Sequence, residues 1–154
     1  MNEDLEVIGM GDAQEIINAS KRISEIEDIK NEFHNHIKKA QPPKAVLGSV
    51  SLRDDVLEAT CLGHTLQAVP RVVIAPDNSF AVEYHFNATY QKETFTVWCF
   101  YLTSNGTLNT TVDNKADGRI CDYNNDYATK KIIVRLSKAL LLSRVFAPTV
   151  LTSV

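Results

Sequence analysis

Cysteine is scarce in this chain, and the three that occur, Cys61, Cys99 and Cys121, lie far apart. An odd number of widely spaced cysteines does not form the framework of a small disulfide-rich domain. The first residues, MNEDLEVIGMGDAQ, are acidic, whereas a secretory signal has positive charge followed by an apolar core. We therefore expect reduced thiols and a cytoplasmic protein.

Long apolar runs and surplus positive charge are also missing. Apart from short strand-like stretches, the longest apolar run is Ala139 to Leu142, far short of the roughly 20 residues of a transmembrane helix. The 16 Lys and Arg and 19 Asp and Glu give a net charge of −3, whereas binding dominated by phosphate contacts needs a strongly basic face. The sequence therefore predicts neither a membrane nor a nucleic acid as partner.

What is present is an ordinary globular composition. The 154 residues are 44% hydrophobic and 23% charged, values typical of folded domains. A chain of this length can form one hydrophobic core. We expect a single domain over residues 1–154.

The N-terminal third predicts one long helix. Asp12 and Glu15 stand at the spacing of a capping residue and the acid three positions later. Pro42 and Pro43 cannot continue a helix, and the residue before a proline is disfavoured in it. We expect a helix over residues 12–40, long enough to project from the domain.

Apolar residues of this helix alternate in steps of three and four. They are Ile16, Ala19, Ile23, Ile26, Phe33, Ile37 and Ala40, with Lys30 in the one missing place. Such heptads are typical of a helix that pairs with another helix, but a long surface helix lying on its own domain shows the same pattern. In a paired helix, Lys30 would weaken the dimer and help to set its register.

Residues 44–112 predict mainly strands in an antiparallel meander. In FAVEYHFNAT, residues 80–89, apolar and polar residues alternate, as in a strand with one buried face. TFTVWCFYLT, residues 94–103, is apolar on both faces and indicates a central strand. Asn105-Gly106 then favours a tight hairpin. The segment from Arg53 to Pro70 is ambiguous between strand and short helix.

A closing helix is expected over residues 126–146. One face carries the apolar residues Ile132, Ile133, Leu136, Ala139, Leu140 and Phe146. A second apolar stripe, Val134, Leu141 and Val145, lies on the far side beside Lys131 and Lys138. A helix apolar on two sides usually lies between two layers or under a subunit, although a partly shielded surface gives the same pattern.

No segment predicts a metal or cofactor site. The loop VDNKADGRICDYNND, residues 112–126, resembles a calcium loop in its Asp and Gly, but Lys115 and Asn124 replace two ligand positions. We interpret it as a turn. His34 and His36 are two apart on a helix, diverge, and are expected to be solvated. Cys61 and His64 are only half of a zinc site.

Two other groups of residues are candidate binding sites. His64 or His85 could act as a base in a pocket of a curved sheet, with Trp98 as its floor. Alternatively, the histidines lie on a solvated surface and Trp98 belongs to the core. Lys131, Arg135 and Lys138 form a basic row that could bind an acidic partner. Alternatively, the row is simply a solvated face of the helix.

The sequence thus predicts an α+β domain: an antiparallel meander sheet of four to six strands with a long N-terminal helix and a C-terminal helix packed on it. We expect a non-enzymatic interaction module that self-associates through its terminal helices, most simply as a dimer, or that binds another protein. The alternative is a small-molecule site or simple acid-base enzyme near Trp98 and His85. The residues expected to carry the interaction are Ile23, Ile26, Phe33, Ile37, Val134, Leu141 and Val145.

Overall fold

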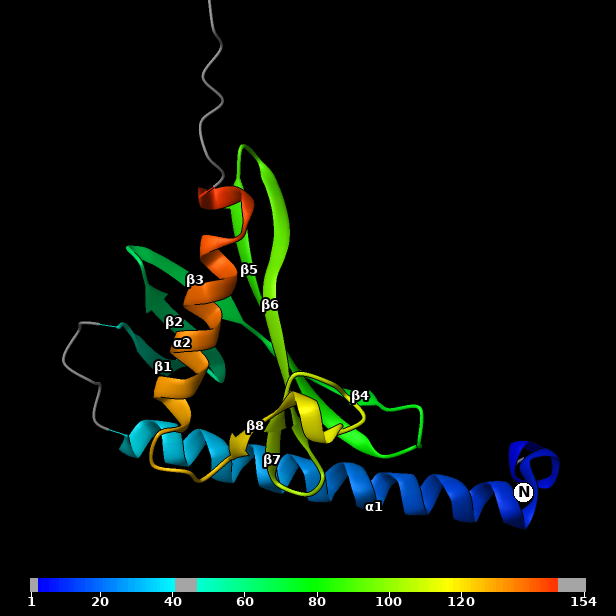
Figure 1. Ribbon diagram of the computed structural model, residues 1–154. Helices are drawn as coiled ribbons and strands as arrows, with labels where there is room; N and C mark the ends of the chain where they lie inside the picture. The colour runs from blue at the N-terminus through cyan, green and yellow to red at the C-terminus, as the bar shows by residue number, and fades with distance from the viewer. Residues whose placement is uncertain (1–2, 41–46, 147–154) are drawn as a thin grey trace, which may run out of the picture.

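A long helix, a curled antiparallel sheet and a shorter helix follow one another along the chain (Figure 1). The computed structural model describes residues 3–40 and 47–146. Its elements are α1 (Glu3–Lys39), β1 (Ser49–Arg53), β2 (Val56–Cys61), β3 (His64–Ala68), β4 (Pro70–Ile74), β5 (Phe80–Tyr90), β6 (Glu93–Thr103), β7 (Thr107–Asn109), η1 (Ala116–Gly118), β8 (Arg119–Asp122), α2 (Ala128–Leu141) and η2 (Arg144–Phe146). The predicted α+β class is confirmed.

The eight strands form one sheet in the order β1-β2-β3-β5-β6-β7-β8, with β4 beside β5. Every pairing is antiparallel. The strand count exceeds the predicted four to six, because the ambiguous segment forms β2 and β3 and the loop of residues 112–126 contributes β8. β3 meets β5 only at Gln67 and Asn87, whereas β4 pairs with β5 over five residues.

Tight turns produce the predicted meander. Gln91 and Lys92 join β5 to β6 with positive φ values of 51° and 68°, the conformation that two-residue hairpin turns require. Gly106, at φ 78°, closes the β6–β7 hairpin, and its amide donates to the Thr103 carbonyl at 2.9 Å. β6 lies between β5 and β7, so its prediction as a central strand is confirmed.

The core lies between one face of the sheet and the two helices. Tyr84, Phe86 and Phe100 are fully buried, and the Tyr84 and Phe100 rings stack with centroids 4.8 Å apart. Phe33 of α1 packs edge-on against both of those stacked rings. α2 contacts β1 and β2 at one edge of the sheet and β6 and β8 toward the other (Figure 1). The concave side of the curl is therefore filled by helix side chains.

Both helices differ from their predicted bounds. α1 begins at Glu3 and bends at Gly9, whose φ of 74° and ψ of 165° are not helical. Asp12 therefore lies in the first turn after the bend, where a carboxylate favours the helix dipole. α2 spans Ala128–Leu141 instead of 126–146 and is followed by η2. In the described part of the chain, no helix is both long and apolar enough to cross a membrane. Pro42, Pro43 and Pro148 lie outside the described residues.

Candidate functional site

The first half of α1 extends beyond the sheet (Figure 1). We call residues 9–21 the arm. Arg22 is where α1 meets the body of the domain, because its guanidinium lies 5.2 Å from the Phe80 ring centre and donates to the Asn78 carbonyl at 3.0 Å. Along the arm, Met10, Ile16 and Ile17 are 89%, 61% and 59% exposed, so its large apolar side chains face water.

The predicted interaction residues of α1 divide at the point where the helix reaches the sheet. Ile26, Phe33 and Ile37 are buried in the core of the chain itself, so they have no surface to offer to a partner. Ile23 is 37% exposed. Lys30 fills the gap in the seam, and its Nζ lies 3.0 Å from Glu27 and 3.8 Å from Asp55. The same heptad pattern therefore packs on the sheet in its second half and is uncovered in its first.

The second apolar stripe of α2 is exposed at two of its three positions. Val134 and Leu141 are 36% and 53% exposed, whereas Val145 is half-buried against the core. On the opposite face, Ile132, Ile133, Leu136 and Leu140 are buried, as their predicted stripe requires. α2 therefore binds the sheet with one face and presents apolar side chains on the other.

Beside Val134, basic side chains surround a surface hollow of about 580 Å³. The hollow is lined by Ile120, Tyr127, Lys130, Lys131, Val134, Arg135 and Lys138. We call its four cations, Lys130, Lys131, Arg135 and Lys138, the α2 basic face. Within residues 3–40 and 47–146, no carboxylate lies within ion-pair distance of any of the four.

The neighbouring thiol of Cys121 experiences this positive charge. Burial raises its pKa, while Lys131, Arg119 and Arg135 act in the opposite direction. The thiols of Cys61, Cys99 and Cys121 are all unpaired; those of Cys61 and Cys121 are buried, and that of Cys99 is half-buried. The hollow beside the α2 basic face can hold an acidic group above a floor formed by Ile120, Tyr127 and Val134.

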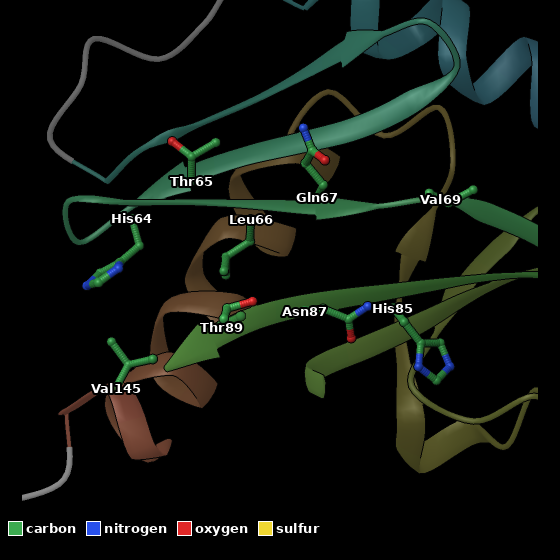
Figure 2. Close-up of a pocket in the computed structure, with 10 residues that line it drawn as sticks. His64, Thr65, Leu66, Gln67, Val69, His85, Asn87, Thr89 and Val145 are labelled. Carbon is green, nitrogen blue, oxygen red and sulfur yellow. The ribbon is translucent and has the colours of Figure 1, made fainter. Parts of the chain in front are cut away.

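A second hollow of about 580 Å³ opens where β3 separates from β5, and both His64 and His85 line it. Figure 2 shows His64 beside Val145 at one end and His85 at the other. The His64 ring packs edge-on against Phe146, 5.4 Å between centroids. Trp98 does not line this hollow; its ring lies against Phe86 and Phe100.

His85 belongs to a polar cluster on the convex face of the sheet. Its Nε2 lies 3.0 Å from Oε1 of Glu83 but outside hydrogen-bonding geometry. Arg71 donates to the same oxygen at 3.1 Å. Burial raises the pKa of Tyr101, which lies beside Cys99 and Glu83. The side chains of Arg71 and His85 therefore both lie within 3.1 Å of the Glu83 carboxylate.

A buried histidine on α1 was not predicted. His34, expected to be solvated, is 3% exposed. Its Nδ1 donates a hydrogen bond to Asp55 Oδ1 at 3.2 Å, and its Nε2 accepts a hydrogen bond from the Tyr84 hydroxyl at 2.8 Å. Burial lowers the pKa of His34. The sequence signal is its place one residue after Phe33 and one turn after Lys30, at the edge of the apolar seam.

His36 was also expected to be solvated, but it is half-buried and its Nε2 donates to the Asn125 carbonyl at 2.8 Å. This contact ties the end of α1 to the segment that leads into α2. The divergence of the two histidines is as predicted, because they contact different elements. Their expected solvation is wrong, since the sheet and the α2 segment approach α1 from two sides.

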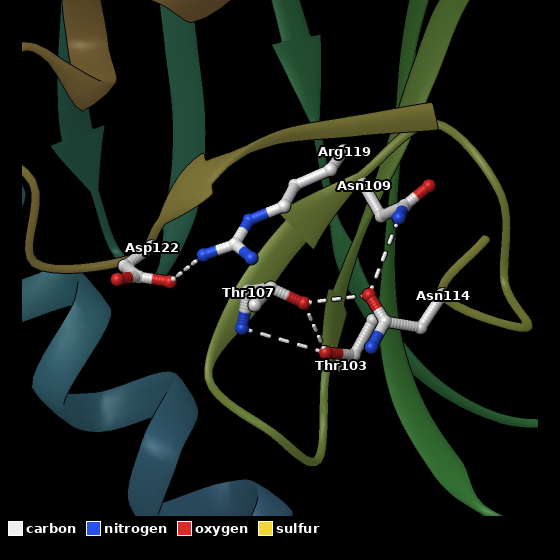
Figure 3. A network of polar contacts seen from close by, with 6 residues as sticks. All are labelled: Thr103, Thr107, Asn109, Asn114, Arg119 and Asp122. Carbon is white, nitrogen blue, oxygen red and sulfur yellow. Dashed lines mark hydrogen bonds and ion pairs between the residues drawn. The ribbon is translucent and has the colours of Figure 1, made fainter. Parts of the chain in front are cut away.

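The loop of residues 112–126 turns the chain, as interpreted from sequence. Its Asn114 Oδ1 accepts from Thr107 at 2.7 Å and from Asn109 at 3.2 Å, and Thr107 contacts Thr103 at 2.7 Å (Figure 3). Gly118 packs so closely that a Cβ there would lie 2.5 Å from Asn109 Oδ1. The Asn114 side chain therefore ties the loop to the side chains of β7. No group of metal-ligating side chains occurs in the described ranges.

No family model, curated protein or solved structure matches this chain.

Proposed function

We propose that this chain is a non-enzymatic protein-interaction module that self-associates, as a dimer in the simplest case, through its terminal helices. The observation that carries the proposal is the arm, where Met10, Ile16 and Ile17 are 59–89% exposed on a helix that has left its own sheet. Fully burying one such side chain contributes about 1.5–3 kcal/mol. Three of them supply a driving force that the isolated chain leaves unused.

Helix physics supports the same conclusion. An isolated helix shorter than about 12–15 residues is marginal in water, and most helical stability in proteins comes from packing of an apolar face. The described residues give the arm no packing of this kind, because the first buried side chain in the described part of α1 is Ile26. A partner that covered the apolar residues would stabilise the helical arm and bury its exposed surface together.

Sedimentation velocity tests this function. At tens of micromolar, wild type is expected to sediment as a dimer, which corresponds to a micromolar or tighter Kd. Ile16→Glu with Ile17→Glu should give monomers, because two charges would have to be buried. A matched variant, Gln14→Glu with Ser20→Glu, adds the same charge to exposed polar positions of the arm and should still dimerise. Monomeric wild type would overturn the proposal.

We also propose a second candidate function, a small-molecule site at the hollow between β3 and β5. The observation that favours it is that His64 and His85 both line this hollow, one at each end. Both imidazoles are partly exposed there and could bind a polar ligand. Titrating imidazole, citrate and nucleoside monophosphates should shift the NMR signals of both rings together. If none of these compounds moves both signals, this candidate fails.

A further inference from the structure

We infer that the arm of one copy docks antiparallel on the α2 basic face of a second copy, and that two chains exchange their arms reciprocally. The inference rests on the proposed self-association and names its two surfaces. One is acidic and apolar, the other basic and apolar. Each is left uncovered by the described residues of its own chain.

The α2 basic face is built to receive an acidic helix. Lys131, Val134, Arg135 and Lys138 follow one another at i, i+3, i+4 and i+7, so they share one side of α2. Like charges at i, i+4 destabilise a helix by about 0.2–0.5 kcal/mol. Carboxylates placed between these cations relieve that repulsion. Val134 supplies an apolar contact at the centre.

The arm has the complementary pattern. Up to Ser20 the sequence contains only acidic charges, Glu3, Asp4, Glu6, Asp12 and Glu15, and its first cation is Lys21. Within the arm, Asp12, Glu15, Ile16 and Ala19 also follow the i, i+3, i+4, i+7 spacing. Asp12 and Glu15 are exposed, and the described residues place no cation within ion-pair distance of either carboxylate.

The two patterns match in one orientation. The spacing i, i+3, i+4, i+7 is the same when it is read backwards. When the arm runs antiparallel to α2, Asp12 therefore faces Lys138, Glu15 faces Arg135 and Ile16 faces Val134. Both carboxylates then oppose cations and the two apolar residues oppose each other. In the parallel orientation Glu15 would instead face Val134. Antiparallel packing also aligns the opposite ends of the two helix dipoles.

The arm cannot reach α2 of its own chain. His36 bonds to Asn125 in the segment that leads into α2, and Glu15 precedes His36 by 21 residues on the same helix. A rise of 1.5 Å per residue puts Glu15 about 30 Å from that point. Figure 1 shows the arm pointing away from α2. The partner must therefore be another molecule.

A second copy is the occupant that closes the assembly. If each chain gives its arm and receives the other, the contact is isologous and a two-fold dimer results. The exchange also doubles the contact, which helps to reach the roughly 1,200–2,000 Å² that stable interfaces bury. If only one of the two arms docked, the pair of chains would keep one free arm and one free basic face. Further copies could then add to both, and filaments would form.

A charge exchange tests the pairing. The arm variant carries Asp12→Lys with Glu15→Lys, and the face variant carries Arg135→Glu with Lys138→Glu. Each alone is expected to raise the dimer Kd by about 10-fold or more, because close like charges oppose association. An equimolar mixture of the two should recover dimers, because the basic arm then meets the acidic face and the acidic arm meets the basic face. A surface control, Arg53→Glu with Lys92→Glu, should dimerise as wild type does.

The outcomes separate this inference from the proposed function. Monomeric wild type overturns both. Dimeric wild type with dimeric single variants, or with a mixture that stays monomeric, overturns the arm–face pairing and leaves self-association standing. All four substituted positions are exposed, so unfolding transitions should match wild type. Should a reversal unfold the chain, the neutral pair Arg135→Gln with Lys138→Gln takes its place and must still weaken the dimer.

Discussion

Tyr84 is wholly buried, yet its hydroxyl has a partner, because His34 accepts its hydrogen bond across the space between β5 and α1. Burial is the main cause that raises the pKa of Tyr84 and lowers that of His34. Both groups therefore stay neutral, and the pair can be buried at low cost. Asp55 completes the chain of contacts from the β1–β2 turn, and its bond to His34 lowers its own pKa.

The lowered pKa of His34 predicts a stability that falls as the pH falls. Below its ordinary pKa of 6.5, the unfolded chain binds the proton before the folded chain does. Stability is therefore lost from about pH 6.5 down to the lower folded pKa, with a slope of at most ~1.4 kcal/mol per pH unit. In urea unfolding, wild type should lose stability relative to His34→Gln between pH 7.5 and 5. The matched His64→Gln should keep the wild-type dependence, and equal slopes for all three would contradict the effect.

Gly118 is required by close packing. Its position admits no Cβ, because Asn109 Oδ1 and Thr110 Oγ1 would lie at 2.5 and 2.6 Å. Gly118→Ala should therefore disturb the Asn and Thr network and cost about 1–3 kcal/mol, as overpacking does. Gly11→Ala is the control, since nothing lies within 4 Å of a Cβ there, and alanine favours a helix. Chemical denaturation should measure the free energy of unfolding of both variants. Equal free energies for Gly118→Ala and Gly11→Ala would contradict the packing argument.

At the scale of elements, α2 shows how one helix carries two different faces. Leu136 is fully buried against the sheet, whereas Leu141 is 53% exposed. Leu136→Ala should therefore destabilise the fold by about 2–5 kcal/mol. Leu141→Ala should change stability by less than about 0.5 kcal/mol, measured where sedimentation shows only monomers. Similar losses for the two leucines would mean that α2 is covered on both sides within one chain.

The sequence predicted elements wherever a local pattern coincides with burial. Alternation in β5 marked Val82, Tyr84, Phe86 and Ala88, which are all buried. It could not settle Arg53 to Pro70, because the face that β2 buries is covered by α2, which is distant in sequence. β8 was missed inside the acidic loop for the same reason, since its partner β7 and its cover α2 define it as a strand.

The candidate site was predictable in its residue types but not in its limits. The heptads of α1 continue unchanged past Arg22, so nothing in the pattern shows where the sheet ends and the arm begins. The basic row of α2 was visible, but Ile120 of β8 joins it, as part of the floor of the hollow, only in the fold. His34 was misjudged because its partner Tyr84 is 50 residues away in the chain.

At the scale of the whole molecule, the packing that stabilises the body of the domain does not include the arm. Among the described residues, the core begins at Ile26, and Arg22 is where α1 meets the β4–β5 turn. The arm adds a helix that shares no core with the rest. It therefore can serve association without serving the fold, and the two properties should respond independently to its removal.

Deleting residues 1–21 tests this independence. The shortened chain keeps Arg22 and every core residue, so its free energy of unfolding as a monomer should change by less than about 0.5 kcal/mol. A change of 1 kcal/mol would shift the Tm of a 150-residue domain by about 2–4 °C, so calorimetry can detect a loss. Sedimentation of the same sample should show only monomers, because both the acidic charges and the apolar residues of the arm are gone. A shortened chain that unfolds early would make the arm part of the fold, and one that still dimerises would move the interface elsewhere.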